Sequence, residues 1–174
     1  CQASPRESHQ SNGAVERAIS TLRGVARVFI QYLSKKTGST IRPGGSWWAW
    51  ALRHASWIYN RFHKLRDQRM TPYMRLKHKD YAQPVLRCGE QVLARRPGMH
   101  LRKADSQFVY GCWVGRDSHT DEHIVLAGTG TFRSRAVKRL TEDNAWNTEL
   151  VDKMRWLPWR TSDVRQGRPP LQSI

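Results

Sequence analysis

The sequence predicts an α+β protein, with long helices before about residue 84 and short antiparallel strands after it. Apolar residues recur at intervals of three and four as far as residue 66, which is helical spacing. After Val85 they fall into short β-prone runs separated by turn residues, which indicates strands. A third observation, a large excess of basic residues, concerns partners rather than fold.

The first predicted helix covers residues 13–36, with Asn12 as a candidate cap and Gly38 as its end. One stripe of apolar residues runs along it over six turns: Val15, Ala18, Ile19, Leu22, Val25, Ala26, Phe29, Ile30 and Leu33. The opposite face carries Glu16, Ser20, Arg23 and Arg27 at intervals of four, three and four. This face has a plain alternative interpretation as a solvated surface with helix-stabilising charge pairs.

The second predicted helix covers about residues 47–66, with Ser46 as its cap. Trp47, Trp50 and Trp57 widen its apolar surface, so we expect packing on more than one side. Base stacking is an alternative role for these indoles, but helical spacing favours the core. Thr71 and Pro72 open a short third helix through Leu76.

The strand-like runs lie close together and are joined mostly by tight turns, which predicts a small antiparallel barrel or sandwich. They are Val85, Gln91–Arg95, Gln107–Val114, His123–Leu126 and Thr131–Val137. Residues 141–174 show little periodicity, and we interpret them as a linker or partly disordered tail.

Composition favours a polyanionic partner. The 174 residues fit one ordinary domain or two small ones, and 30 Lys and Arg against 14 Asp and Glu give a net charge of +16. No apolar run approaches the roughly 20 residues of a membrane span, so no membrane partner is expected. Three widely spaced cysteines argue against a secreted disulfide framework and favour a nuclear or cytoplasmic setting. Because the chain begins at Cys1 rather than Met, we expect a fragment of a longer protein.

Metal chemistry is the most specific question that the sequence raises. A lone Glu16 cannot hold the two divalent ions of a phosphoryl-transfer site, so any partner carboxylates are expected upstream of Cys1. Oxygen ligands would suit Mg²⁺ or Mn²⁺. Zinc is a weaker alternative, in which His119 and His123 would act with Cys88 and Cys112, but no Cys-x2-Cys pair accompanies them.

Four segments, in order, resemble retroviral and retrotransposon integrases. Residues 4–17 are similar to the family's S-P-x-x-P-Q-x-N-G-x-x-E-R segment, with His9 in place of the usual Pro. Residues 51–73 resemble the A-x-x-x-x-N-R and T-P-Y-E patterns of copia-type polyproteins, with Met74 in place of Glu. Residues 89–96 resemble the G-x-x-V-x-x-R opening strand of the integrase C-terminal barrel. Residues 109–115 and 133–137 resemble the G-x-x-x-G-Y and S-R-D-V segments, with Ala136 in place of Asp.

The resemblance implies the end of an RNase H-like catalytic core over residues 1–83 and a small SH3-like β-barrel over 84–140, followed by the tail. It implies that Glu16 is the third metal-binding carboxylate, with Asn12, Ser20 and Arg23 near the donor DNA end. Ser20 stands where the family often has Lys, which weakens that contact. The family's two aspartates lie before this segment, so the chain is expected to be a polynucleotidyl transferase fragment that is inactive alone. Mg²⁺ or Mn²⁺ is expected only in the complete site.

DNA is therefore the expected partner, held by its phosphate backbone with weak sequence preference, and a homo-oligomer is expected at full length. The candidate DNA-binding residues are Asn12, Ser20, Arg23, Arg27, Arg61, Lys64, Arg66, Arg69, Lys77, Lys79, Arg95, Arg96, Arg102 and Lys103. One alternative is a non-catalytic nucleic-acid-binding or chromatin adaptor derived from an integrase. Another is an unrelated basic protein such as a ribosomal or RNA-packaging component.

Overall fold

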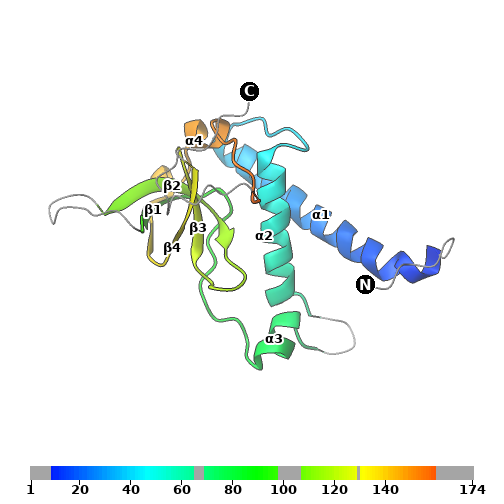
Figure 1. Ribbon diagram of the computed structural model, residues 1–174. Helices are drawn as coiled ribbons and strands as arrows, with labels where there is room; N and C mark the ends of the chain where they lie inside the picture. Colours follow the sequence, from blue (N-terminus) through cyan, green and yellow to red (C-terminus); the bar gives the residue numbers. More distant parts are fainter. Residues whose placement is uncertain (1–8, 65–68, 98–106, 129, 160–174) are drawn as a thin grey trace.

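The structure is a computed structural model that describes residues 9–64, 69–97, 107–128 and 130–159. Two long helices pack together and against one face of an antiparallel sheet (Figure 1). The helices are α1 (His9–Thr37), α2 (Ser46–Phe62), α3 (Pro72–Lys77), the 3-10 turn η1 (Glu142–Asn144) and α4 (Thr148–Asp152). The strands are β1 (Gln91–Arg95), β2 (Phe108–Arg116), β3 (His123–Ala127), β4 (Gly130–Ser134) and β5 (Val137–Arg139). The predicted α+β class is confirmed.

Helix α1 is longer than expected at its start. It begins at His9, so Asn12 lies inside the helix and the prediction that it caps the helix is wrong. At the other end Gly38 adopts φ +72°, and its N–H donates to Ser34 O at 2.8 Å, as expected for a glycine that ends a helix.

The apolar stripe of α1 is buried only in its second half. Ala26, Ile30 and Leu33 lie in the core against α2 and the sheet. Val15 and Ile19, near the start, are 59% and 43% exposed. The first half of α1 therefore extends away from the sheet (Figure 1), with apolar and polar side chains both facing solvent.

Helix α2 supplies the centre of the core. Trp47, Trp50 and Trp57 are 5%, 0% and 5% exposed, so their predicted core role is confirmed. Ser46 is the first residue of the helix rather than its cap, and its Oγ donates to Met154 O at 3.2 Å. The helix ends at Phe62, earlier than expected.

Helix α3 begins as predicted. The Thr71 side chain accepts a hydrogen bond from Met74 N at 3.0 Å, and Pro72 occupies the first helical position. The helix ends where His78 turns into the left-handed conformation at φ +54°.

The sheet has the order β4-β3-β2-β1-β5, and every neighbouring pair is antiparallel. It is open, with β4 and β5 at its edges, so the expected closure into a barrel is not observed. The predicted run 131–137 is divided between β4 and β5. At the division the Ser134 hydroxyl donates to Arg95 O at 2.8 Å, which directs the chain from β3 toward β1.

The sheet is buried on both faces over part of its area. One face holds a cluster of Leu86, Val92, Ala94, Trp113, Val125 and Phe132. On the other face Cys112, Val114, Ile124 and Leu126 pack with α1 and α2, because alternate residues of a strand face opposite sides. Helices and sheet therefore share a core across the boundary expected near residue 84.

The segment after the sheet differs from expectation. Trp47 Nε1 donates to Val151 O at 2.9 Å, and Trp50 Nε1 donates to Trp156 O at 2.8 Å. Val151 and Met154 are buried in the core beside these indoles. Residues 141–159, expected to belong to a linker or partly disordered tail, are instead partly helical and packed on α2. Residues 160–174 lie outside the described part.

Candidate nucleic-acid interface

The polar face of α1 is open to solvent. Glu16, Ser20, Arg23 and Arg27 are all exposed. In the part of the chain that the structure describes, neither arginine forms an ion pair. Asn12 lies on the same helix, and its side chain is not among those that the structure describes. Two guanidinium groups are thus available to an incoming anion beside one carboxylate.

Among the described residues of α1, Glu16 is the only carboxylate on this face. Within the described ranges no group of three His, Cys, Asp or Glu side chains could hold a metal ion. A single exposed carboxylate does not fit a pair of divalent ions, which require several shared oxygen ligands. We therefore derive no catalytic step from this chain alone.

A second group of cations follows α2. Lys64, Arg69, Lys77 and Lys79 are exposed, and no ion pair involves them among the residues described. They lie around α3, whose Leu76 is also exposed. This segment can therefore contact a polyanion through its exposed cations.

Arg61 differs from these cations although it is close in sequence. Its guanidinium carbon lies 4.2 Å from the ring centroid of Trp57 and 5.2 Å from that of Tyr81. Its Nη2 lies 3.9 Å from Asp121 Oδ1. Burial lowers the pKa of Arg61, and Asp121 opposes that effect. Since the side chain is buried and stacked, Arg61 holds α2 to the loops around it, and we leave it out of the proposed interface.

The sheet contributes Arg95, which is exposed, and Arg96, which is half-buried. Arg66, Arg102 and Lys103, the other predicted DNA contacts, lie outside the described residues. The candidate interface in the described part therefore consists of the α1 face, the cations around α3, and Arg95 with Arg96.

Acidic side chains of the sheet and its loops are occupied within the protein. Asp117 Oδ2 lies 3.1 Å from Arg133 Nη2 and 4.0 Å from Arg53 Nη2. Burial would raise the pKa of Asp117, but the N–H groups of Thr120 and His119 and the nearby arginines lower it overall. These ion pairs hold the Asp117 carboxylate within the protein.

Sequence reasoning missed the carboxylate of Glu90, which is fully buried. Its Oε1 accepts from Arg139 Nε at 2.7 Å, and its Oε2 accepts from Arg87 Nε at 3.0 Å. Burial would raise the pKa of Glu90, but hydrogen bonds from Arg139 and Arg87 lower it below its usual range. Only the tertiary structure reveals this role, because the residue follows a turn and has no periodic signal.

The four side chains considered for zinc have other roles. Cys88 and Cys112 are buried thiols, and burial raises the pKa of each to about 12, which keeps them protonated. His123 Nδ1 accepts a hydrogen bond from Trp113 Nε1 at 3.0 Å, and burial lowers its pKa to about 4. His119 is exposed. These residues give no support to a zinc site.

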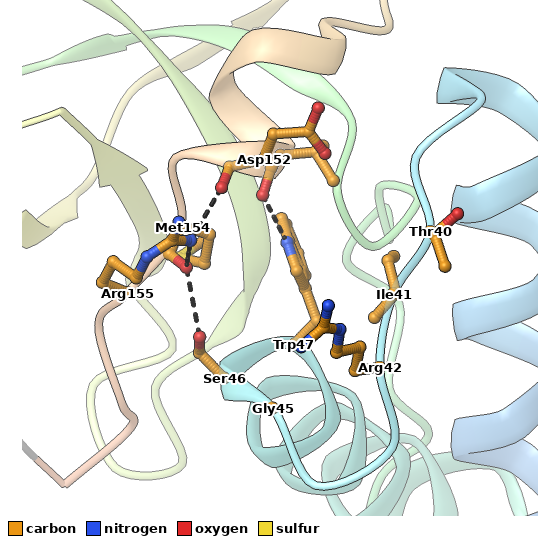
Figure 2. A pocket seen from close by; sticks show the side chains of 10 residues that line it. Thr40, Ile41, Arg42, Gly45, Ser46, Trp47, Asp152, Met154 and Arg155 are labelled. Carbon is orange, nitrogen blue, oxygen red and sulfur yellow. Dashed lines mark hydrogen bonds between the residues drawn. The ribbon is translucent and has the colours of Figure 1, made fainter.

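An open cleft of about 440 Å³ lies between the 40–45 loop, the start of α2 and α4 (Figure 2). Arg155 Nη1 at its edge donates to the carbonyl oxygens of Asp152 and Met154 at 2.7 and 2.9 Å. Ser46 also donates to Met154 O, and Trp47 forms a wall. The Arg155 hydrogen bonds stay within the segment after α4, whereas the Ser46 hydrogen bond joins that segment to the start of α2.

Comparison with protein-family models, curated proteins and solved structures gave no match to this chain. No helix in the described ranges has both the length and the apolar character needed to cross a membrane.

Proposed function

We propose that this chain binds nucleic acid through the exposed cations of α1 and of the segment around α3. In this proposal it is the C-terminal part of a retrotransposon-type integrase that acts in DNA integration. Glu16 would contribute one metal-binding carboxylate to a strand-transfer site whose other carboxylates this sequence does not supply.

The observation that carries the proposal is the placement of Arg23 and Arg27 on the same exposed face as Glu16, without internal ion-pair partners in the described part. Cations beside a bare metal ligand would repel the metal. Beside a DNA phosphate they are favourable, because guanidinium groups bind phosphate oxygens in a bidentate manner and orient the backbone.

The strand order supports the narrower assignment of the sheet. Four strands form a meander, and β5 returns to pair with β1, an arrangement that suits an SH3-like domain. The Gly89 turn that precedes β1 is part of the sequence segment that resembles the integrase barrel. Its φ of +86° favours glycine, and a Cβ there would lie 2.5 Å from Leu33 Cδ1 of α1. The same glycine therefore permits both the turn and the close approach of helix and sheet.

The direct experiment is duplex DNA binding by fluorescence anisotropy over a series from about 50 to about 200 mM salt. The observed association constant should fall steeply and linearly on logarithmic axes, because each phosphate contact releases condensed counterions. Two duplexes of unrelated sequence should give similar affinities. A flat salt response would contradict the proposal.

A non-catalytic adaptor derived from an integrase is the second candidate, and the isolation of Glu16 within the described part favours it. With Mg²⁺ or Mn²⁺ this chain alone should join no DNA ends under either candidate. Two aspartates on predicted strands upstream in the reading frame would favour the integrase, and an unrelated upstream domain would favour the adaptor. DNA joining by this chain alone would contradict the account of Glu16 as an incomplete site.

A further inference from the structure

One part of the sheet surface is covered by neither helix. Leu93 in the middle of β1 pairs with Tyr110 of β2 on one side and with Lys138 of β5 on the other. Directly paired residues project to the same face, so these three side chains form a row across three strands. In the next row Arg95 pairs with Phe108. The two rows place aromatic and cationic side chains together on one face.

The exposure of this patch distinguishes it from the rest of the sheet. Tyr110 is 57% exposed, whereas Cys112, two residues further along the same face of β2, is buried under the helices. Arg95 and Lys138 are exposed as well. Lys138 Nζ lies 4.8 Å from the ring centroid of Phe108, so the lysine side chain reaches across β1. The result is an open phenol ring on β2 with Arg95 and Lys138 exposed on the neighbouring strands β1 and β5 of the same face.

We infer that this patch binds single-stranded nucleic acid by stacking a base on Tyr110, with Arg95 and Lys138 contacting the adjacent phosphates. This inference deepens the proposed function and rests on it. A base in a duplex has both faces covered by its neighbours, so an exposed ring on a sheet surface is accessible chiefly to unpaired bases. The pairing of rings with cations matches the alternation of bases and phosphates along a single strand.

The test compares single-stranded and duplex oligonucleotides of the same sequence with the complete chain and its Tyr110 variants. Tyr110→Ala should weaken single-strand binding by about tenfold or more, the typical effect of removing a stacking ring. Duplex affinity should change by less than about twofold, because the phosphate contacts of α1 are retained. Tyr110→Phe should retain single-strand affinity and Tyr110→Leu should lose it, which separates stacking from simple apolar contact. An oligonucleotide carrying 2-aminopurine should lose fluorescence on binding the unmodified chain but not Tyr110→Ala.

The outcomes separate this inference from the function on which it rests. If the chain binds duplex DNA but its single-strand affinity is the same with and without the Tyr110 ring, the stacking site is overturned and the proposed function stays intact. An equal loss of single-strand and duplex affinity in Tyr110→Ala would also overturn the stacking site. Full single-strand affinity in Tyr110→Leu would overturn it as well, because it would indicate an apolar contact of the kind a protein partner makes. No binding of either nucleic acid by the unmodified chain would refute the proposed function itself. Circular dichroism of each variant checks that the exposed substitution leaves the fold unchanged.

Discussion

Arg139 Nε donates to Glu90 Oε1 at 2.7 Å, and the Glu90 carboxylate has no exposed surface. Arg87 contacts the other oxygen of the same carboxylate and also donates to both oxygens of Glu142, at 3.0 and 2.7 Å. These contacts connect β5, the turn before β1 and η1. The buried carboxylate thus joins the last strand and the following segment to the rest of the sheet.

Glu90→Gln should lower the free energy of unfolding by about 2 kcal/mol, because a neutral amide would replace the buried carboxylate that accepts charge-assisted hydrogen bonds from Arg139 and Arg87. Urea denaturation followed by tryptophan fluorescence measures the change. Glu149→Gln is the matched control, since Glu149 forms an exposed pair with Lys153 at 3.5 Å and should cost less than about 0.5 kcal/mol. Equal effects of the two substitutions would show that the buried pair has no special role.

Stability should also fall in mild acid because of His54. Burial, and then the nearby Arg53, lower the pKa of His54 to about 4, whereas an unfolded histidine titrates near about 6.5. The unfolded chain therefore takes up the proton first, so the stabilisation is complete above about pH 6.5 and is lost as pH falls toward 4. The expected loss from this group is about 3 kcal/mol.

His54→Phe tests this assignment, because the imidazole Nδ1 has no hydrogen-bond partner in the described structure and the ring packs among Phe29, Trp57 and Trp113. The slope of unfolding free energy against pH between about 7 and 5 should decrease in this variant. A residual slope is expected from His123, whose pKa is lowered in the same direction. An unchanged slope would rule out His54 as its source.

Removal of the segment after the sheet should unfold or strongly destabilise the protein. A chain ending at residue 141 loses Val151 and Met154 from the core and both carbonyl acceptors of the Trp47 and Trp50 indoles. We expect a loss of several kcal/mol, comparable with the whole stability of a small domain, measured by thermal denaturation. A chain ending at residue 159 is the reference, because it keeps every described residue of this segment. Similar melting temperatures for both truncations would contradict the packing described here.

Much of the fold could be predicted from local pattern. Helical spacing located α1 and α2, and the threonine and proline of the third helix predicted its first residue. The segment after residue 141 could not be predicted in this way. Its short helix has no long periodic pattern, and its order depends on hydrogen bonds from indoles about a hundred residues earlier.

The candidate site was predictable where it depends on one helix, since spacing alone places Glu16 and Arg23 on one face. The burial of Arg61 was not predictable, because its charge is visible in the sequence but its stacking on Trp57 and Tyr81 is not. Tyr110 was not singled out, because its exposure depends on which half of the sheet the helices cover.

The most direct test of the central claim compares two double variants that each remove two positive charges. Arg23→Gln with Arg27→Gln changes unpaired cations on the Glu16 face. Arg133→Gln with Arg135→Gln changes arginines that pair with Asp117 and Glu122 at 3.1 and 3.0 Å. If the α1 face contacts DNA, the first variant should reduce the logarithmic salt slope of duplex binding by about 1.8, and the second should leave it nearly unchanged. An equal reduction in both would show that net charge, rather than the α1 face, determines binding, and would contradict the account.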